Sequence, residues 1–213
     1  MESNLLLILG AVAAGFLIGR LISRKKPVYQ LQNTGEALVR IVISEHLPRG
    51  SWHLLNNITL PLASGSTTQI DHILISRFGI FVIETKHYAG WIFGEAGSRE
   101  WTQVVYSQKN KFQNPLMQNN HHIKVVQDNL DFLDSWQVQG MVVFTGTAEF
   151  KTIKPSGVYS LQTMIDHLRS RDVEVLSENR MQFCIGRLEH LRLALTQETD
   201  VQHQTNLQSR RRY

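Results

Sequence analysis

Two apolar runs within residues 69–87 constrain the fold of this chain most strongly. Ile, Val and Phe dominate both runs, and a Phe-Gly pair at Phe78 and Gly79 separates them. Strand-forming residues on either side of a glycine-containing turn predict a β-hairpin, with a two-residue turn at Phe78 and Gly79. Both runs also carry charged residues, which a buried hairpin does not need for its own stability.

The charged residues of the hairpin are Asp71, Glu84 and Lys86. In the predicted register Asp71 lies directly opposite Lys86, and Glu84 is its diagonal neighbour on the same face. Opposed Cβ atoms in an antiparallel pair are about 5 Å apart, and diagonal ones about 7–8 Å. Two carboxylates and one ammonium group are therefore expected to meet at one place on the sheet, whereas a shift by one residue would separate them.

Two close carboxylates repel each other unless a cation lies between them. Asp71, Glu84 and the backbone carbonyl of Thr85 form an oxygen-rich set that suits Mg²⁺ or Mn²⁺. Such an ion could polarise a phosphodiester and activate a water molecule, while Lys86 would add positive charge where phosphate charge develops. A simple cross-strand salt bridge between Lys86 and either acid is the alternative. Because burying charges for stability alone is unfavourable, their place after an apolar run favours a functional site.

The order Asp, then Glu-x-Lys on the next strand, is the signature of PD-(D/E)xK nucleases. Five sequence pieces occur in the order found in one particular family: Gly35-Glu36; Gln69-Ile70-Asp71-His72; the run from Gly79 to Lys86; Gly90, Gly94 and Trp101; and Asn114-Pro115-Leu116-Met117-Gln118. Residues 30–145 thereby closely resemble the NERD (nuclease-related domain) family.

The resemblance implies an α/β, restriction-endonuclease-like core, in which helices flank a mixed central β-sheet. It also implies a divalent-metal site with Asp71 and Glu84 as metal ligands, Lys86 as the group that polarises phosphate or water, and Glu36 and Gln118 as accessory residues. Ile70 stands where the generic motif has proline.

Glu36 has a second interpretation. With Asn33 as N-cap it could complete a capping box at the start of a helix that extends to about Leu47. The two roles are compatible with each other.

Gln118 follows Asn114 and Pro115, which predict a helix start with Asn as N-cap and Pro at the first helical position. Gln118 near that helix N-terminus could point at a phosphate, although an exposed polar face is the alternative. His121 and His122 are not predicted as metal ligands, because adjacent helix residues point about 100° apart.

The 213 residues allow one domain of ordinary size with short accessory segments. Cys184 is the single cysteine, so the chain can form neither an internal disulfide nor a cysteine-based zinc site. Both facts suit a reducing compartment. Cys184 lies in a helical pattern and is predicted to be a small core residue.

The net charge of +4 comes from the two ends of the chain. Without residues 1–26 and 210–213, 15 basic and 17 acidic residues remain, a net charge of −2. The charge therefore gives no evidence for a broad basic face. Nucleic acid, with DNA favoured over RNA, would have to bind in a local groove, with metal ions offsetting the acidic centre.

Residues 5–22 are apolar apart from Arg20 and would span about 27 Å as a helix, close to the thickness of the bilayer core. Basic residues follow directly at 24–26, which predicts a single-pass anchor in the cell (inner) membrane, with the N-terminus outside and the rest of the chain in the cytoplasm. A cleaved signal peptide is the alternative.

The expected organisation is an anchor with a basic flank at 1–26, a NERD-type domain at 27–196 and a polar, disordered tail at 197–213. The domain has its core at about 30–145 and an extension at 146–196. Further strands are expected at 53–62, 88–95, 99–107, 139–145 and within 148–160, and helices at 114–133, 161–170 and 178–195. Trp91, Phe93 and Trp101 are expected to pack on the sheet, with base stacking as the alternative.

The sequence thus predicts a membrane-anchored, metal-dependent nuclease that hydrolyses DNA phosphodiester bonds. The alternative is a catalytically inactive nuclease-fold module that binds nucleic acid or a protein partner at the membrane.

Overall fold

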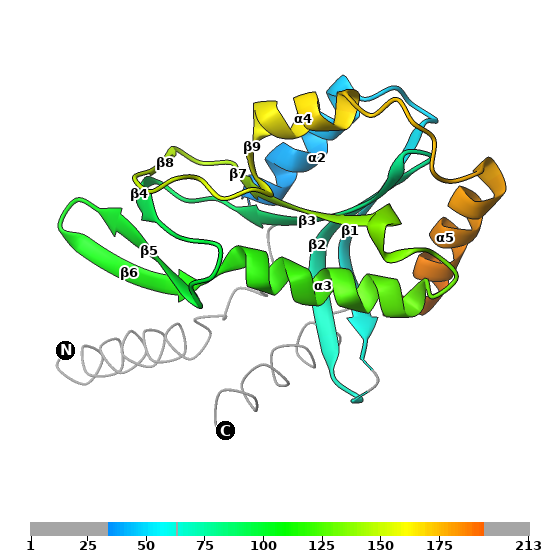
Figure 1. Ribbon diagram of the computed structural model, residues 1–213, viewed down its shortest axis with the longest axis horizontal. Coiled ribbons are helices and arrows are strands. Elements are labelled where there is room, and N and C mark those ends of the chain that lie inside the picture. Colours follow the sequence, from blue (N-terminus) through cyan, green and yellow to red (C-terminus); the bar gives the residue numbers. More distant parts are fainter. Residues whose placement is uncertain (1–33, 63, 194–213) are drawn as a thin grey trace, which may run out of the picture. The chain divides into compact units, whose positions relative to one another are not determined.

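The structure, a computed structural model, describes residues 34–62 and 64–193, which lie within the unit Gln32–Tyr213 (Figure 1). The expected anchor at 1–26 and the tail at 197–213 lie outside these residues. Within the described ranges, no helix combines the length and the apolar character needed to cross a bilayer.

The described residues form an α/β fold of two mixed sheets flanked by helices, which confirms the predicted fold class at this level. The helices are α2 (Thr34–His46), α3 (Pro115–Asn129), α4 (Leu161–Arg169) and α5 (Glu178–Leu191), with a 3₁₀ turn at Ser135–Gln137. The central sheet contains β1 (Trp52–Pro61), β2 (Thr67–Ser76), β3 (Gly79–Lys86), β7 (Val138–Phe144) and β9 (Val158–Ser160). The smaller sheet contains β4 (Gly90–Phe93), β5 (Glu100–Val105), β6 (Gln108–Gln113) and β8 (Ala148–Phe150).

The central sheet has the order β1-β2-β3-β7-β9. Its first three strands pair antiparallel, and β3, β7 and β9 are parallel to one another. Helices α2 and α4 cover one face of this sheet, and α3 and α5 cover the other (Figure 1). Because both faces are covered, β2 and β3 read as nearly continuous apolar runs rather than as an alternating pattern.

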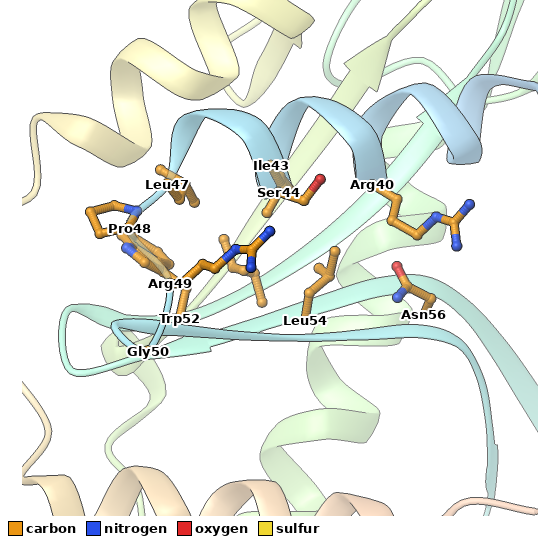
Figure 2. A pocket seen from close by; sticks show the side chains of 11 residues that line it. Arg40, Ile43, Ser44, Leu47, Pro48, Arg49, Gly50, Trp52, Leu54 and Asn56 are labelled. Atoms are coloured by element: carbon orange, nitrogen blue, oxygen red, sulfur yellow. The ribbon is translucent and has the colours of Figure 1, made fainter.

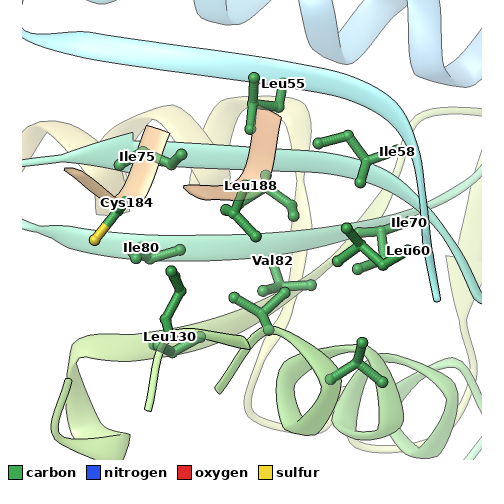
Figure 3. Close-up of a cluster of buried hydrophobic side chains, with 14 of the residues drawn as sticks. Leu55, Ile58, Leu60, Ile70, Ile75, Ile80, Val82, Leu130, Cys184 and Leu188 are labelled. Atoms are coloured by element: carbon green, nitrogen blue, oxygen red, sulfur yellow. The ribbon is translucent and has the colours of Figure 1, made fainter. Parts of the chain in front are cut away.

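Side chains of β2 and β3 alternate between two cores, as the period of two requires. Ile80 and Val82 join α3 and α5, whereas Phe81 and Ile83 join α2 and α4. Figure 3 shows the first of these cores, in which α5 contributes Cys184. The thiol is fully buried, and burial raises its pKa to about 11, so the prediction of a core cysteine is confirmed.

The β2–β3 turn differs from the predicted one by one position. Ser76 pairs with Gly79, so Arg77 and Phe78 form the turn. Gly79 adopts the positive φ of +129° that the connection needs, and neither Arg77 nor Phe78 does so. The Ser76 hydroxyl accepts a bond from the Phe78 amide (3.0 Å) and donates one to the Gly79 carbonyl (3.1 Å), which fixes this turn.

The corrected turn shifts the register by two residues, so the predicted partner of Asp71 is wrong but its face of the sheet is not. Continued from His72↔Ile83, the last pair of the β2–β3 ladder, the register brings Asp71 opposite Glu84, with Lys86 as the diagonal neighbour. Beyond that pair, β2 continues along β1 and β3 continues along β7. In Figure 1, β2 accordingly turns away from β3.

The smaller sheet contains a strand that the sequence did not predict. β6 is polar and largely exposed, and only Phe112 packs inward, against Trp101 on β5. Trp101 is buried, as expected, but Trp91 and Phe93 on β4 are 50% and 39% exposed. The expectation that all three aromatic residues pack on a sheet is therefore wrong for these two.

Candidate active site

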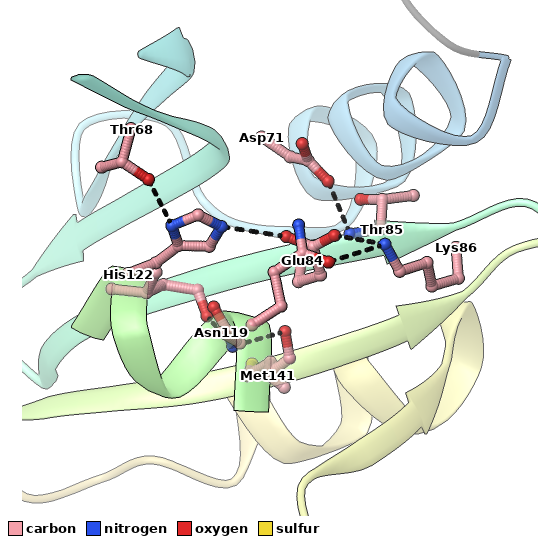
Figure 4. A network of polar contacts seen from close by, with 10 residues as sticks. Thr68, Asp71, Glu84, Thr85, Lys86, Asn119, His122 and Met141 are labelled. Carbon is pink, nitrogen blue, oxygen red and sulfur yellow. Dashed lines mark hydrogen bonds and ion pairs between the residues drawn. The ribbon is translucent and has the colours of Figure 1, made fainter. Parts of the chain in front are cut away.

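The predicted site residues meet where the β2–β3 ladder ends, and Figure 4 shows three of them, Asp71, Glu84 and Lys86. Asp71 comes from β2 and Glu84 and Lys86 from the end of β3, while α2 contributes Glu36 and α3 contributes Gln118. Each of the five interacts with at least one other member of the group. The structure therefore brings together all the side chains that the sequence assigned to the site.

Lys86 connects two elements. Its Nζ donates hydrogen bonds to Glu84 Oε1 at 2.6 Å and to Gln118 Oε1 at 3.1 Å. Burial alone would lower the pKa of Lys86, but the neighbouring Glu84 carboxylate outweighs that effect, and the net pKa is raised. Lys86 is thus held as an ammonium ion, and Gln118 faces the site rather than forming an exposed polar surface.

Asp71 has the most unusual electrostatic environment of the group. Its pKa is raised well above the ordinary value, first because burial penalises the charged form and second because Glu84 lies nearby. The Thr85 amide donates a hydrogen bond to Asp71 Oδ2 at 2.7 Å and opposes this rise in pKa. A second positive group would relieve the repulsion between the two acids.

Glu84 lies between two basic side chains. Burial raises the pKa of its carboxyl, but contacts with His122 and Lys86 outweigh that effect, and the net pKa is lowered. Oε1 accepts the Lys86 bond, and Oε2 lies 3.4 Å from His122 Nε2. Oε2 has no hydrogen-bond partner of normal geometry among the described residues, so it can still accept a ligand.

His122 is the site residue that the sequence reasoning missed. Its ring is buried, with Nδ1 3.1 Å from the Thr68 hydroxyl and Nε2 directed toward Glu84 (Figure 4). The direction of adjacent helix residues excludes that His121 and His122 share one ion, yet one histidine is enough to contact Glu84. One sequence feature could have identified His122: it follows Gln118 by four residues, so the two side chains lie on one face of α3.

Two asparagines position helix α3: Asn114 caps its start, and Asn119 binds it to the sheet. The side chain of Asn114 caps the helix by accepting a bond from the Leu116 amide at 2.9 Å, which confirms the predicted start. Buried Asn119 donates to the carbonyls of Val82 (3.0 Å) and Met141 (3.2 Å) on adjacent strands. These bonds fix Gln118 and its neighbours on α3 over the end of β3.

Helix α2 approaches the end of β3 closely at Gly35. A Cβ built on Gly35 would lie 2.6 Å from Thr145 Oγ1 and 2.8 Å from His87 Cβ, so only glycine fits this contact. The next residue, Glu36, is half-buried, and its pKa is raised by burial and by Glu84 against the opposing effect of Lys86. The predicted capping box cannot be compared, because Asn33 lies outside the described residues.

The cluster offers hard oxygen donors for a divalent cation. The Glu84 carboxylate is buried and the nearby Asp71 carboxylate is half-buried, and the backbone carbonyl of Thr85 completes the predicted set. Within the described ranges, no three His, Cys, Asp or Glu side chains converge to hold a metal by themselves. A bound ion would therefore need water or phosphate oxygens as further ligands, which is the usual manner of Mg²⁺ binding.

Comparison with known proteins supports the resemblance seen in the sequence. The sequence profile of the nuclease-related domain matches residues 31–145, more than half of the chain. An uncharacterized protein of Bacillus anthracis is 36% identical over 169 residues, which cover 79% of this chain and 71% of the relative. The matched profile range contains all five predicted site residues and His122. The chain therefore belongs to the NERD (nuclease-related domain) family, as its motifs predicted.

Proposed function

We propose that this NERD domain is a divalent-metal-dependent nuclease that hydrolyses phosphodiester bonds at Asp71, Glu84 and Lys86. The observation that carries the proposal is the convergence of half-buried Asp71, buried Glu84 and Lys86 at the point where β2 leaves β3. Burial and, after it, the nearby Glu84 raise the pKa of Asp71. Placing such a pair in the interior is costly, and a bound cation would offset that cost. A restriction-endonuclease-like core is part of the same proposal.

Each residue has a chemical role in this proposal. Asp71, Glu84 and the Thr85 carbonyl would hold Mg²⁺ or Mn²⁺, and the bound ion would supply a Lewis acid and an activated water. Lys86, kept charged by Glu84, would stabilise the negative charge that develops on the phosphate. Gln118 orients the Lys86 ammonium through its 3.1 Å bond, and Glu36 adds a carboxyl group at the edge of the cluster.

A cleavage assay with the full chain tests this proposal. Labelled DNA and RNA would be incubated with Mg²⁺, Mn²⁺ or EDTA, with DNA expected to be the better substrate. Lys86→Met should reduce metal-dependent cleavage by about 100-fold or more, because a charge that stabilises the transition state is lost. Lys124→Met is the matched control, since Lys124 is exposed on α3 and pairs only with Asp128 among the described residues. Equal cleavage by both variants would eliminate the site.

We also propose that residues 5–22 anchor the domain to the cell membrane, with the domain in the cytoplasm. The apolar run and the basic residues that follow it support this placement. Deleting residues 1–23 should move the protein from the membrane fraction to the soluble fraction. A truncated chain that stays firmly in the membrane fraction would contradict the anchor.

A catalytically inactive module that binds nucleic acid or a protein partner is the second candidate. It is favoured by the small ligand set, because no three metal-binding side chains converge within the described residues. Nucleic-acid binding without cleavage at any concentration of Mg²⁺ or Mn²⁺ would support this candidate.

A further inference from the structure

A groove between α2 and β1 is not used by the proposed chemistry (Figure 2). It encloses about 340 Å³. Its floor is apolar; Arg40 and Asn56 lie at one end, and Arg49 extends from the other end, beside Trp52, toward the middle, where Ser44 lies. Polar groups spaced along an apolar floor suit an elongated ligand that carries charge at intervals.

The charge of the groove has one sign. Among the described residues, no acidic side chain lines the groove, and neither Arg40 nor Arg49 forms an ion pair. By contrast, Arg77 and Arg192 are paired with glutamates. Two exposed guanidinium groups that pair with no acid of the described residues, spaced along one groove, fit the phosphates of an anionic ligand.

The groove begins where the candidate active site ends. Arg40 follows Glu36 by four residues, so the two side chains lie on one face of α2. On β1, Asn56 Oδ1 accepts a hydrogen bond from Nδ1 of His72 at 2.8 Å, and His72 is the residue after Asp71. The charges of Arg40 and Glu84 both act on His72. One strand of a bound polymer could therefore extend from the acidic cluster into the groove.

We infer that this groove holds a strand of the nucleic-acid substrate on one side of the cleaved bond. Arg40 would contact a phosphate next to the active site, and Arg49 a phosphate further along the strand. The half-buried Trp52, packed on Phe78 and Phe81, forms an apolar wall beside Arg49 that suits a base or sugar. The direction of the strand rests on the proposed nuclease function, whereas binding in the groove can be measured without cleavage. Residues 27–209 have a net charge of −2 and offer no broad basic face, so a nucleic acid would need a local groove of this kind.

The test measures binding by fluorescence anisotropy, with the full chain carrying Asp71→Asn and with EDTA present to prevent cleavage. Labelled single strands of increasing length are titrated at several salt concentrations. Arg40→Glu and Arg49→Glu should each weaken binding about tenfold and lower the slope of log affinity against log salt by about 0.7, because each removes one phosphate contact. Arg40→Lys should keep the slope, because it keeps the charge.

Arg180→Glu is the matched control, with the same change of charge at an exposed position on α5, across the sheet. The inference is overturned if the groove variants bind like this control, or if a mononucleotide competes as well as the longest strand. The proposed function can fail separately. If the unmodified chain binds nucleic acid but does not cleave it, the inference about the groove is still supported. If Arg40→Glu and Arg49→Glu both leave cleavage unaffected, the groove does not bind the substrate, but the proposed nuclease function is still supported.

Discussion

His122 Nε2 lies 3.4 Å from Glu84 Oε2, the carboxylate oxygen that Lys86 does not contact. Glu84 is thus held between a histidine from α3 and a lysine from its own strand, and both lower its pKa. The Thr68 hydroxyl, 3.1 Å from His122 Nδ1, orients the ring from the other side. This chain of contacts fixes the orientation of Glu84 within the cluster.

The first prediction concerns His122→Phe. Because His122 lowers the pKa of Glu84, its removal should raise that pKa and move the acidic limb of the pH–rate profile to higher pH. The loss of cleavage should be greater at pH 5 than at pH 8, because a protonated Glu84 cannot hold the cation. His122→Gln should restore part of the wild-type profile, since its amide nitrogen can replace Nε2 near Glu84. A His122→Phe profile that coincides with the wild-type profile would show that His122 has no influence on Glu84.

The second prediction concerns Asp71→Asn without metal. The pKa of Asp71 is raised in the fold, so its contribution to stability is present at low pH and is lost as pH rises through the folded-state pKa. Asp71→Asn should therefore raise the unfolding temperature by several degrees at pH 8 in EDTA, and by less at pH 4. With Mn²⁺ present the order should reverse, because only the wild type gains stability from binding. Scanning calorimetry at both pH values measures this. A wild type that remains the more stable protein in EDTA at pH 8 would contradict it.

The third prediction concerns His72, which is fully buried on β2. Burial, the charge of Arg40 and an opposing effect of Glu84 together lower its pKa to about 4. Because the unfolded chain takes up this proton near pH 6.5, stability is complete above pH 6.5 and falls by about 3 kcal/mol as pH drops to 4. In His72→Asn, which keeps a donor toward Asn56, that part of the slope should disappear. Urea unfolding across this pH range measures the slope, and an identical slope in both proteins would exclude His72 as its source.

The fourth prediction concerns Gly35→Ala. The added Cβ would lie 2.6 Å from Thr145 Oγ1, so α2 must move away from β3, at a cost of about 1–3 kcal/mol in unfolding free energy. Gly186→Ala is the control: a Cβ there meets nothing within 4 Å, and the change should stabilise α5 by about 0.5–1 kcal/mol. Urea unfolding compares the two variants. A Gly35→Ala protein as stable as the control would show that α2 docks without this close contact.

Local rules were sufficient for much of the fold. The buried strands β2, β3 and β7 are apolar runs of the right length, and Asn114-Pro115 marks the start of α3, so these elements could be read from the sequence. The face shared by Asp71, Glu84 and Lys86 was also predictable. Side chains alternate with a period of two, so a register shift of two residues leaves each of them on the same face.

Long-range contacts decided the rest. The turn was misplaced because Gly79 supplies its positive φ after the turn rather than within it. Strand β6 has too few apolar residues to be recognised, since only its pairing with β5 and the contact of Phe112 with Trp101 hold it in place. The four-residue spacing puts His122 on the same face of α3 as Gln118, but its contact with Glu84 depends on how α3 docks over β3 through Asn119, which local patterns do not give.

Isothermal titration calorimetry with Mn²⁺ and the full chain tests most directly the central claim, that Asp71 and Glu84 form a metal site. The wild type should bind Mn²⁺ at its acidic cluster, and Asp71→Asn and Glu84→Gln should each abolish that binding. Asp128→Asn, at an exposed carboxylate on α3, should leave it unchanged. Absence of Mn²⁺ binding to the wild type at millimolar concentration, or undiminished binding by both site variants, would contradict a metal-dependent centre at Asp71 and Glu84.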